Sequence, residues 1–304
     1  MICITFCIGL LLLVTGGELL VHSGVALANK LRLSPLVIGI VLMGCGTSLP
    51  ELSASLSAMF TNPPTPGIAF GNVIGSNISN ILFILGLSAL ISPIRIPKET
   101  FRRDGSFLII SVLMLGVIMA YGYLDSIIGL FLLFSILGYF FICYDKKSNA
   151  DIQQPKVKSK KPVWLLGTLS VLGIVSIVYG ARFLVSAATD IATLFGVSKA
   201  VLGLTLVAFG TSLPEVTVST VAAIHKHSDV AYGNIIGSNI SNIFLIVGAI
   251  GMARTTEVPQ MWQSFWIMAA VTFILLICGI KGRIPRWMGA LFLIAYGGYV
   301  YVLF

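Results

Sequence analysis

The chain has 304 residues, of which 57% are hydrophobic and only 10% charged, and its mean hydropathy is +1.00. A soluble domain carries about 25% charged residues, so this composition excludes a soluble enzyme, a disordered tail and a secreted disulfide scaffold. The net charge of +8 does not indicate nucleic-acid binding, because the 19 lysines and arginines are concentrated in loops between apolar segments. Membrane topology and contact with anionic lipid account for basic loops of this kind.

Apolar runs between polar breaks predict an all-α, polytopic membrane protein with ten transmembrane helices. A helical span needs about 20 apolar residues, so ten spans leave room only for short loops. No lysine or arginine precedes Lys30, whereas a cleaved signal peptide starts with a basic segment, so the first run is expected to remain as a span. In chain order the predicted spans are about 2–24, 36–60, 69–92, 105–121, 125–143, 163–183, 199–224, 231–252, 260–280 and 285–303.

The longest polar segment separates these spans into two groups of five. Residues 145–162 contain six lysines and no apolar cluster, a composition typical of a solvated linker. The predicted halves are therefore residues 1–144 and 163–304. The odd-numbered loops hold 16 of the 19 basic residues. The positive-inside rule then predicts a cytoplasmic linker, with both termini outside the cell membrane.

Two motifs occur once in each half. The sequence GTSLPE at 46–51 recurs unchanged at 210–215, and GNVIGSNISNI at 71–81 recurs at 233–243 with one change. Because each half has an odd number of spans, the second copy is expected to cross the membrane in the opposite direction. Inverted repeats of this kind are typical of transporters whose ion or substrate site lies near the middle of the membrane, between interrupted helices.

The first motif predicts a broken helix in each half. Pro50 has no N–H to donate to the carbonyl of Gly46, and its ring crowds that turn; Pro214 has the same effect in the second copy. A break would expose carbonyl oxygens near Gly44 to Thr47. Broken backbone at membrane depth is tolerated only where it is buried or lines a water-filled cavity, and carbonyl oxygens there can bind hard cations.

Glu51 and Glu215 follow the two predicted breaks directly. They are the only acidic residues that lie near the middle of an apolar span and are repeated. A carboxylate at the bilayer centre costs roughly 2.5–3.5 kcal/mol on insertion scales and indicates a functional site by default. No lysine or arginine repeats within the spans, so a cation from outside is the expected partner. The alternative is a structural carboxylate that caps the broken helix.

The second motif adds neutral oxygen ligands at four-residue spacing, which places them on one helix face. Amide, hydroxyl, carbonyl and carboxylate oxygens together suit calcium or sodium and disfavour soft transition metals. The alternative is a set of interhelical hydrogen bonds. The residues of this stripe are Asn72, Ser76 and Asn80 in the first half and Asn234, Ser238 and Asn242 in the second.

Glu18 is acidic but is not repeated, because Arg182 occupies the equivalent position 164 residues later. We expect it either to reach a membrane surface or form an ion pair there, or to line the entry path for ions. The three histidines, His22, His225 and His227, lie outside both motifs, and loop or interface roles are expected for them.

The paired motifs resemble the α-repeats of the cation/calcium exchanger superfamily, and specifically those of the short prokaryotic sodium/calcium exchangers. The resemblance covers nearly the whole chain. It implies that calcium and sodium share Glu51 and Glu215, and that the first and sixth spans move as a gate. It further implies that the backbone carbonyls of Thr47 and Thr211 help bind calcium, and that Asn80 and Asn242 complete the central site. The sodium ligands it implies are Ser48, Ser76, Ser212, Ser238 and the backbone carbonyls of Gly44 and Ala208.

The resemblance implies sodium/calcium antiport by a membrane protein that is not an enzyme and needs no cofactor or obligate protein partner. Potassium-dependent relatives carry Asp at the position of Asn242, so potassium independence is expected. Calcium/proton antiport is the alternative with a different coupling ion. A passive channel is disfavoured because two carboxylates would hold a divalent ion too tightly for fast exit. An intramembrane hydrolase using Ser48 or Ser212 is disfavoured because no histidine accompanies either serine.

Overall fold

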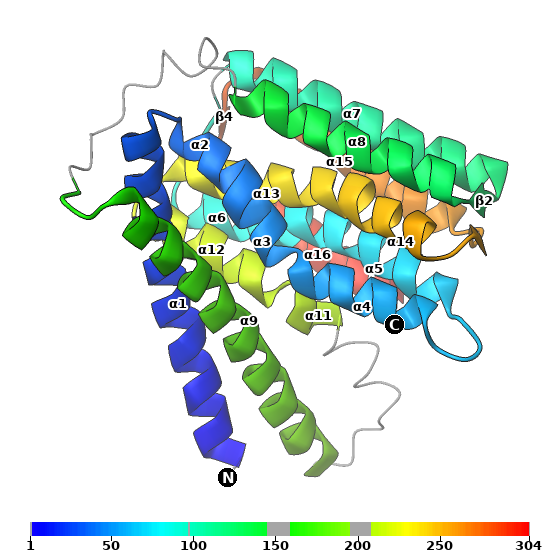
Figure 1. Ribbon diagram of the computed structural model, residues 1–304, viewed down its shortest axis with the longest axis horizontal. Coiled ribbons are helices and arrows are strands. Elements are labelled where there is room, and N and C mark those ends of the chain that lie inside the picture. Colours follow the sequence, from blue (N-terminus) through cyan, green and yellow to red (C-terminus); the bar gives the residue numbers. More distant parts are fainter. Residues whose placement is uncertain (1, 97, 145–158, 195–207, 304) are drawn as a thin grey trace.

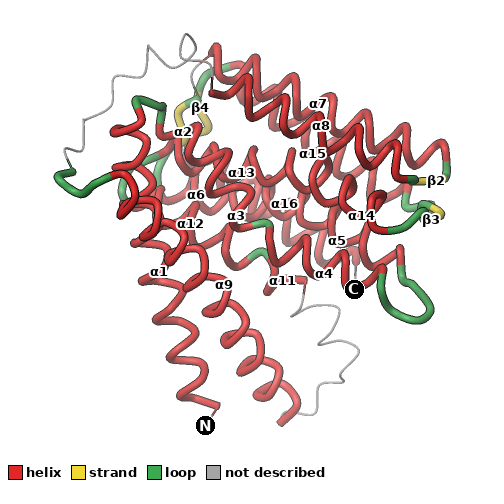
Figure 2. Tube along the Cα trace, in the orientation of Figure 1, coloured by secondary structure: helices red, strands yellow, loops and turns green. Residues whose placement is uncertain are grey.

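The computed structural model describes residues 2–96, 98–144, 159–194 and 208–303. Within these ranges the protein is helical, apart from four two-residue strands in loops between helices (Figures 1 and 2). Eight of the described helical segments are long and apolar enough to cross a membrane. The predicted helical, multi-pass membrane protein is therefore confirmed. Most of the predicted linker and the start of the predicted seventh span lie outside the described residues.

The first half contains three long uninterrupted helices and two apolar segments that are broken into shorter pieces. The second and third apolar segments each change from α- to π-helical geometry part of the way along. In chain order the elements are α1 (Ile2–Leu31), α2 (Pro35–Ile38), η1 (Gly39–Gly44), α3 (Cys45–Thr47), α4 (Leu49–Met59), α5 (Pro66–Ser79), η2 (Asn80–Leu85), α6 (Gly86–Ile91), β1 (Ile94–Arg95), α7 (Lys98–Tyr121), β2 (Tyr123–Leu124) and α8 (Ser126–Tyr144).

The described part of the second half has a matching order of elements. Its α12 follows a short helix in the same way as α4, and its α13 continues into a π-helical segment in the same way as α5. The elements are α9 (Val163–Leu194), α11 (Ala208–Thr211), α12 (Leu213–Ile224), α13 (Ser228–Ser241), η5 (Asn242–Val247), α14 (Gly248–Ala253), β3 (Thr256–Glu257), α15 (Trp262–Ile280), β4 (Arg283–Ile284) and α16 (Arg286–Leu303).

Three helices are longer than the apolar runs that predicted them. Helix α1 continues from residue 24 to Leu31, α7 begins at Lys98 and not at residue 105, and α9 continues from residue 183 to Leu194. The extra turns of α1 stay helical because Val25, Ala26 and Ala28 are buried against neighbouring helices. An apolar run shows where side chains avoid water, whereas a helix ends where its backbone hydrogen bonds end. Boundaries drawn from hydropathy therefore fell short here.

Helices α1 and α9 pack along each other and project from the rest of the bundle (Figure 1). Glycines permit their close approach: a Cβ on Gly9 would lie 2.9 Å from the carbonyl oxygen of Gly180, and one on Gly173 would lie 3.0 Å from that of Gly16. Small residues at such crossings are the usual means of packing helices inside membranes.

The remaining helices form the body of the bundle, in which elements of one half contact elements of the other. Helix α13 packs against η1, α8 against α14, and α6 against α16. Two antiparallel strand pairs, β1 with β4 and β2 with β3, join loops of the two halves. Gly237 of α13 lies so close to η1 that a Cβ there would be 2.7 Å from the carbonyl oxygen of Ile40. This contact places the second copy of the longer motif against the segment that leads into the first GTSLPE copy.

We predict that Gly237→Ala separates α13 from η1 and lowers the free energy of unfolding by about 1–3 kcal/mol, the usual cost of overpacking. Thermal unfolding of the detergent-purified protein measures this loss. The matched control is Gly297→Ala in α16, where no described atom lies within 4 Å of the added Cβ. Equal thermal stability of the two variants would contradict the packing at Gly237.

Candidate ion-binding site

Both GTSLPE copies interrupt a helix at their serine. Ser48 has φ −80° and ψ 5° between α3 and α4, and Ser212 has φ −87° and ψ 0° between α11 and α12. The predicted helix breaks are therefore confirmed, but the Gly44 carbonyl is not freed as expected, because it accepts a hydrogen bond from Ser48 N at 3.3 Å. Each break starts a new helix whose first turn contains the glutamate of the motif, Glu51 or Glu215. The positive end of a helix dipole stabilises a carboxylate at that position.

The two glutamates are buried, and each is held by the serine of the opposite motif. Glu51 and Glu215 are both 1% exposed. Ser212 Oγ donates a hydrogen bond to Glu51 Oε1 at 3.3 Å, and Ser48 Oγ donates one to Glu215 Oε1 at 3.2 Å. The crossed pair of hydrogen bonds joins the two copies of the first motif into one polar centre, although they are 164 residues apart in the sequence.

Asn72 holds the backbone around Glu51. Its Nδ2 atom donates to the carbonyl oxygen of Glu51 at 3.1 Å and to Ser55 Oγ at 2.9 Å. These bonds fix α5 against α4 one helical turn beyond the break. Asn72 was expected to lie on a polar face of its helix, and the structure shows that this face meets Ser55 of α4.

Asn234 makes the equivalent contacts in the second half. Its Nδ2 atom donates to Ser219 Oγ at 2.9 Å and to the carbonyl oxygen of Glu215 at 3.4 Å. Its Oδ1 atom accepts a hydrogen bond from Thr47 Oγ1 at 3.3 Å, and the same hydroxyl lies 2.9 Å from the carbonyl oxygen of Met43. Thr47 is thereby tied to the opposite half of the bundle.

The carbonyl of Gly44 is engaged by side chains from both halves. It accepts a hydrogen bond from Ser238 Oγ at 3.2 Å, and Ser48 Oγ lies 2.9 Å away, so the single proton of Ser48 is shared between this carbonyl and Glu215. The expected sodium ligands Gly44, Ser48 and Ser238 therefore lie together. An ion bound here would have to share or replace these hydrogen bonds.

Asn80 and Asn242 are buried at the points where α5 and α13 change into π-helices. Each is 1% exposed and is the first residue of η2 or η5. Asn242 Nδ2 donates to Asn77 Oδ1 at 3.3 Å, which links the two copies of the second motif. π-helical turns frequently occur at functional sites. The sequence motifs gave no sign of these turns, and Asn77 was not among the expected ligands.

Of the other expected site residues, Ser76 is buried on α5 and Thr211 is half-buried at the end of α11. Ala208 is the first residue of α11, directly after the undescribed residues 195–207.

Several buried oxygens of this centre have no hydrogen-bond partner within the described part of the chain. They are Oε2 of Glu51, Oε2 of Glu215, Oδ1 of Asn242 and Oδ1 of Asn80, together with Asn80 Nδ2. Buried polar atoms normally have a partner. Nor does a described lysine or arginine form an ion pair with either glutamate. The centre therefore offers carboxylate and amide oxygens that could bind a hard cation.

A multi-pass helical membrane protein with buried carboxylates between broken helices belongs to the class of ion transporters. The family model described as "Sodium/calcium exchanger protein" matches residues 1–144 and 165–304. The chain therefore belongs to the sodium/calcium exchanger family, as the paired motifs predicted. It is a transporter family, which confirms the expectation that the chain is not an enzyme.

Individual relatives match over nearly the full length. The chain is 34% identical to the sodium/calcium exchanger MaX1 of Methanosarcina acetivorans over 346 aligned positions, covering 98% of this chain and 97% of MaX1. It is 33% identical to the inner membrane protein YrbG of Escherichia coli, covering 93% and 91%. A solved structure of the sodium-calcium exchanger NCX_Mj superposes with a TM-score of 0.87 at 32% identity, covering 99% of this chain and 97% of that one.

We predict that Asn72→Ala lowers the free energy of unfolding by about 1–3 kcal/mol, because the carbonyl of Glu51 and the hydroxyl of Ser55 lose a buried donor. Thermal unfolding in detergent measures the change. The control is Gln263→Ala, which removes an exposed amide on α15 and should leave the transition unchanged. An Asn72→Ala protein as stable as this control would show that the amide does not fix the glutamate turn.

Proposed function

We propose that the chain is a sodium/calcium antiporter in which both ions compete for one site that opens alternately to the two sides of the membrane. The observation that carries this proposal is the pair of buried glutamates, each hydrogen-bonded to the serine of the other motif. Two carboxylates balance one Ca²⁺ or two Na⁺. Calcium and sodium can each bind only when the other has left. Each ion therefore shifts the same equilibrium between the two open states of the site when it is bound.

In this proposal Glu51 and Glu215 bind both ions. The remaining ligands follow the roles implied by the family resemblance. Calcium is also bound by the carbonyls of Thr47 and Thr211, sodium by Ser48, Ser76, Ser212, Ser238 and the carbonyls of Gly44 and Ala208, and Asn80 and Asn242 complete the centre. The unpartnered oxygens of Glu51, Glu215, Asn80 and Asn242 support this assignment.

The two halves, residues 1–144 and 163–304, are proposed to be inverted repeats. Across a two-fold axis each contact occurs twice with the partners exchanged. The contact of Ser48 with Glu215 has such a counterpart in that of Ser212 with Glu51. The glycine contacts between α1 and α9 are exchanged in the same way. These exchanged contacts support a pseudo-two-fold arrangement.

The proposed topology places the linker 145–162 in the cytoplasm and both termini outside the cell membrane, in accordance with the basic residues of the odd-numbered loops. Reporter fusions test it. Alkaline phosphatase fused after residue 304 should be active, and green fluorescent protein fused after residue 150 should fluoresce. An inactive phosphatase at the C-terminus together with an active one at residue 150 would contradict this topology.

Calcium uptake into proteoliposomes tests the function. Vesicles loaded with sodium should take up radioactive calcium, whereas vesicles loaded with choline should not, and potassium should not be needed. Glu51→Gln and Glu215→Gln should each abolish uptake, because removing one charge leaves the site unable to balance Ca²⁺. Glu257→Gln is the matched control, since Glu257 is an exposed acid on β3 and lies outside both motifs.

Each failure of this experiment has a distinct meaning. Uptake that follows a pH gradient instead of sodium would indicate calcium/proton antiport. Uptake without any counter-ion gradient would indicate a channel. Full sodium-dependent uptake by both glutamine variants would place the ion site elsewhere in the chain.

A further inference from the structure

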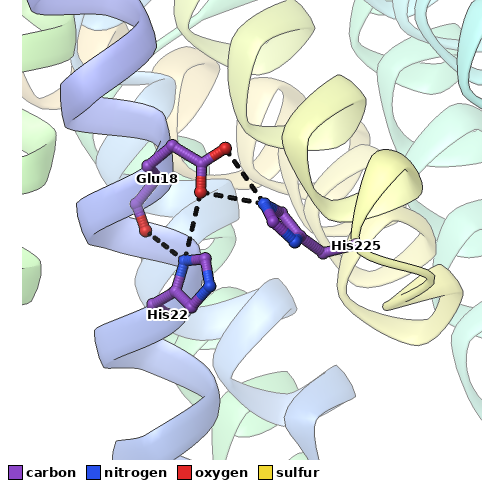
Figure 3. A group of neighbouring side chains, drawn as sticks. All are labelled: Glu18, His22 and His225. Atoms are coloured by element: carbon purple, nitrogen blue, oxygen red, sulfur yellow. Dashed lines mark hydrogen bonds and ion pairs between the residues drawn. The ribbon is translucent and has the colours of Figure 1, made fainter.

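A second group of ligand-type side chains lies away from the repeated motifs. Glu18 and His22 come from α1, and His225 directly follows α12 (Figure 3). Glu18 Oε2 lies 3.2 Å from His22 Nδ1 and 2.8 Å from His225 Nε2. One ligand atom from each residue lies within 4.8 Å of the other two. The structure thus gives a specific partner to Glu18, the acidic residue that the duplication did not explain.

The backbone holds these three side chains in place. Glu18 and His22 are four residues apart, so they lie on one face of α1. The turn after α12 is fixed by successive hydrogen bonds, from His225 N to the Val221 carbonyl at 3.0 Å and from His227 N to the Ala222 carbonyl at 2.8 Å. This hydrogen-bonded turn therefore holds the ring of His225 toward α1.

Two imidazoles and one carboxylate form a ligand set that suits a transition-metal ion. Zn²⁺ binds histidine nitrogen and carboxylate oxygen at about 2.0–2.2 Å in tetrahedral geometry, which separates neighbouring ligand atoms by about 3.4 Å. The two separations between Glu18 and the histidines, 2.8 and 3.2 Å, are near that value, and the two histidine nitrogens lie within 4.8 Å of each other. The side chains of His22, Glu18 and His225 are 60%, 42% and 34% exposed, so a hydrated ion can reach them.

We propose that Glu18, His22 and His225 bind a first-row transition-metal ion such as Zn²⁺, with water as the fourth ligand, and that the bound ion slows exchange. The nitrogen donors favour such an ion over Ca²⁺ or Na⁺. On binding, each imidazole carries its proton on the ring nitrogen that does not contact the metal. Metal–ligand bonds then replace the hydrogen bonds to the Glu18 carboxylate and the contact of His22 Nδ1 with the Glu18 backbone carbonyl at 2.9 Å.

The effect on exchange follows from what the site connects. Helix α12 carries Glu215 in its first turn and ends beside His225. A metal bridging α1 and His225 would therefore cross-link α1 to a helix of the proposed ion site. This part of the inference rests on the proposed function, since it requires the separation of α1 and α12 to change during transport.

Metal binding is tested first, without transport. Co²⁺ is titrated into the detergent-purified full chain, and its visible d–d absorption is followed before and after Zn²⁺ is added. We expect one Co²⁺ per chain, displaced by Zn²⁺. The affinity for Co²⁺ should fall at least about tenfold in His22→Gln and His225→Gln. Removing a metal ligand weakens metal binding at least as much as removing a hydrogen bond that orients a ligand. His227→Gln is the control, because it removes a neighbouring histidine outside the group.

Two binding results would overturn the proposal. One is the absence of Co²⁺ binding to the unchanged chain. The other is equal affinity in all four proteins, with the strong charge-transfer absorption of a cobalt–thiolate bond, which would place the metal on cysteines such as the exposed Cys3 and Cys7.

Transport is the second arm. Zn²⁺ should inhibit sodium-dependent calcium uptake by the unchanged chain and by His227→Gln, and should have little effect on His22→Gln and His225→Gln. Without Zn²⁺ all four should take up calcium equally.

Equal inhibition of all four proteins would place Zn²⁺ at the glutamates. Zn²⁺ binding with undiminished calcium uptake would contradict the cross-link. Absence of uptake before Zn²⁺ is added would count against the proposed antiport alone, because Co²⁺ binding is measured separately.

Discussion

The crossed hydrogen bonds between Ser48 and Glu215, and between Ser212 and Glu51, are the interaction on which the rest of the structure depends. Two carboxylates buried inside a membrane bundle are costly, by roughly 2.5–3.5 kcal/mol each on insertion scales. Hydroxyl donors and the positive ends of α4 and α12 offset part of this cost. No described basic side chain offsets the remainder. A cation that enters and leaves would stabilise the charged centre, and this explains why buried carboxylates suit a transporter.

Much of the architecture around this centre serves to place those four side chains. The helix breaks put each glutamate in a first turn, and Asn72 and Asn234 hold the turns from neighbouring helices. The approach of α13 to η1 at Gly237 brings opposite halves into contact. The serines, glutamates, asparagines and Gly237 all lie in repeated motifs, so a change at one of them has a matching position in the other half.

The sequence predicted the helical membrane fold, the helix breaks and the family, because each rests on a local signal. Proline removes a backbone donor wherever it occurs, and an unaltered hexapeptide repeat is visible without a structure. The pairing of Ser48 with Glu215 could not be predicted, since it depends on how two halves dock. The π-helical turns that begin at Asn80 and Asn242 could not be predicted either, because no residue pattern in the motifs distinguishes them from α-helical turns. Likewise, Glu18 and His225 are 207 residues apart in the chain, and only the packing of α1 on α12 brings them together.

The central claim is that sodium and calcium occupy one site built on both glutamates. Equilibrium binding of radioactive calcium to the detergent-purified protein, measured at increasing sodium concentration, tests this most directly. Competition for one site predicts that sodium raises the apparent Kd for calcium and leaves the number of calcium ions bound per chain unchanged. Calcium binding that is indifferent to sodium, or that loses capacity at constant Kd, would contradict a shared site.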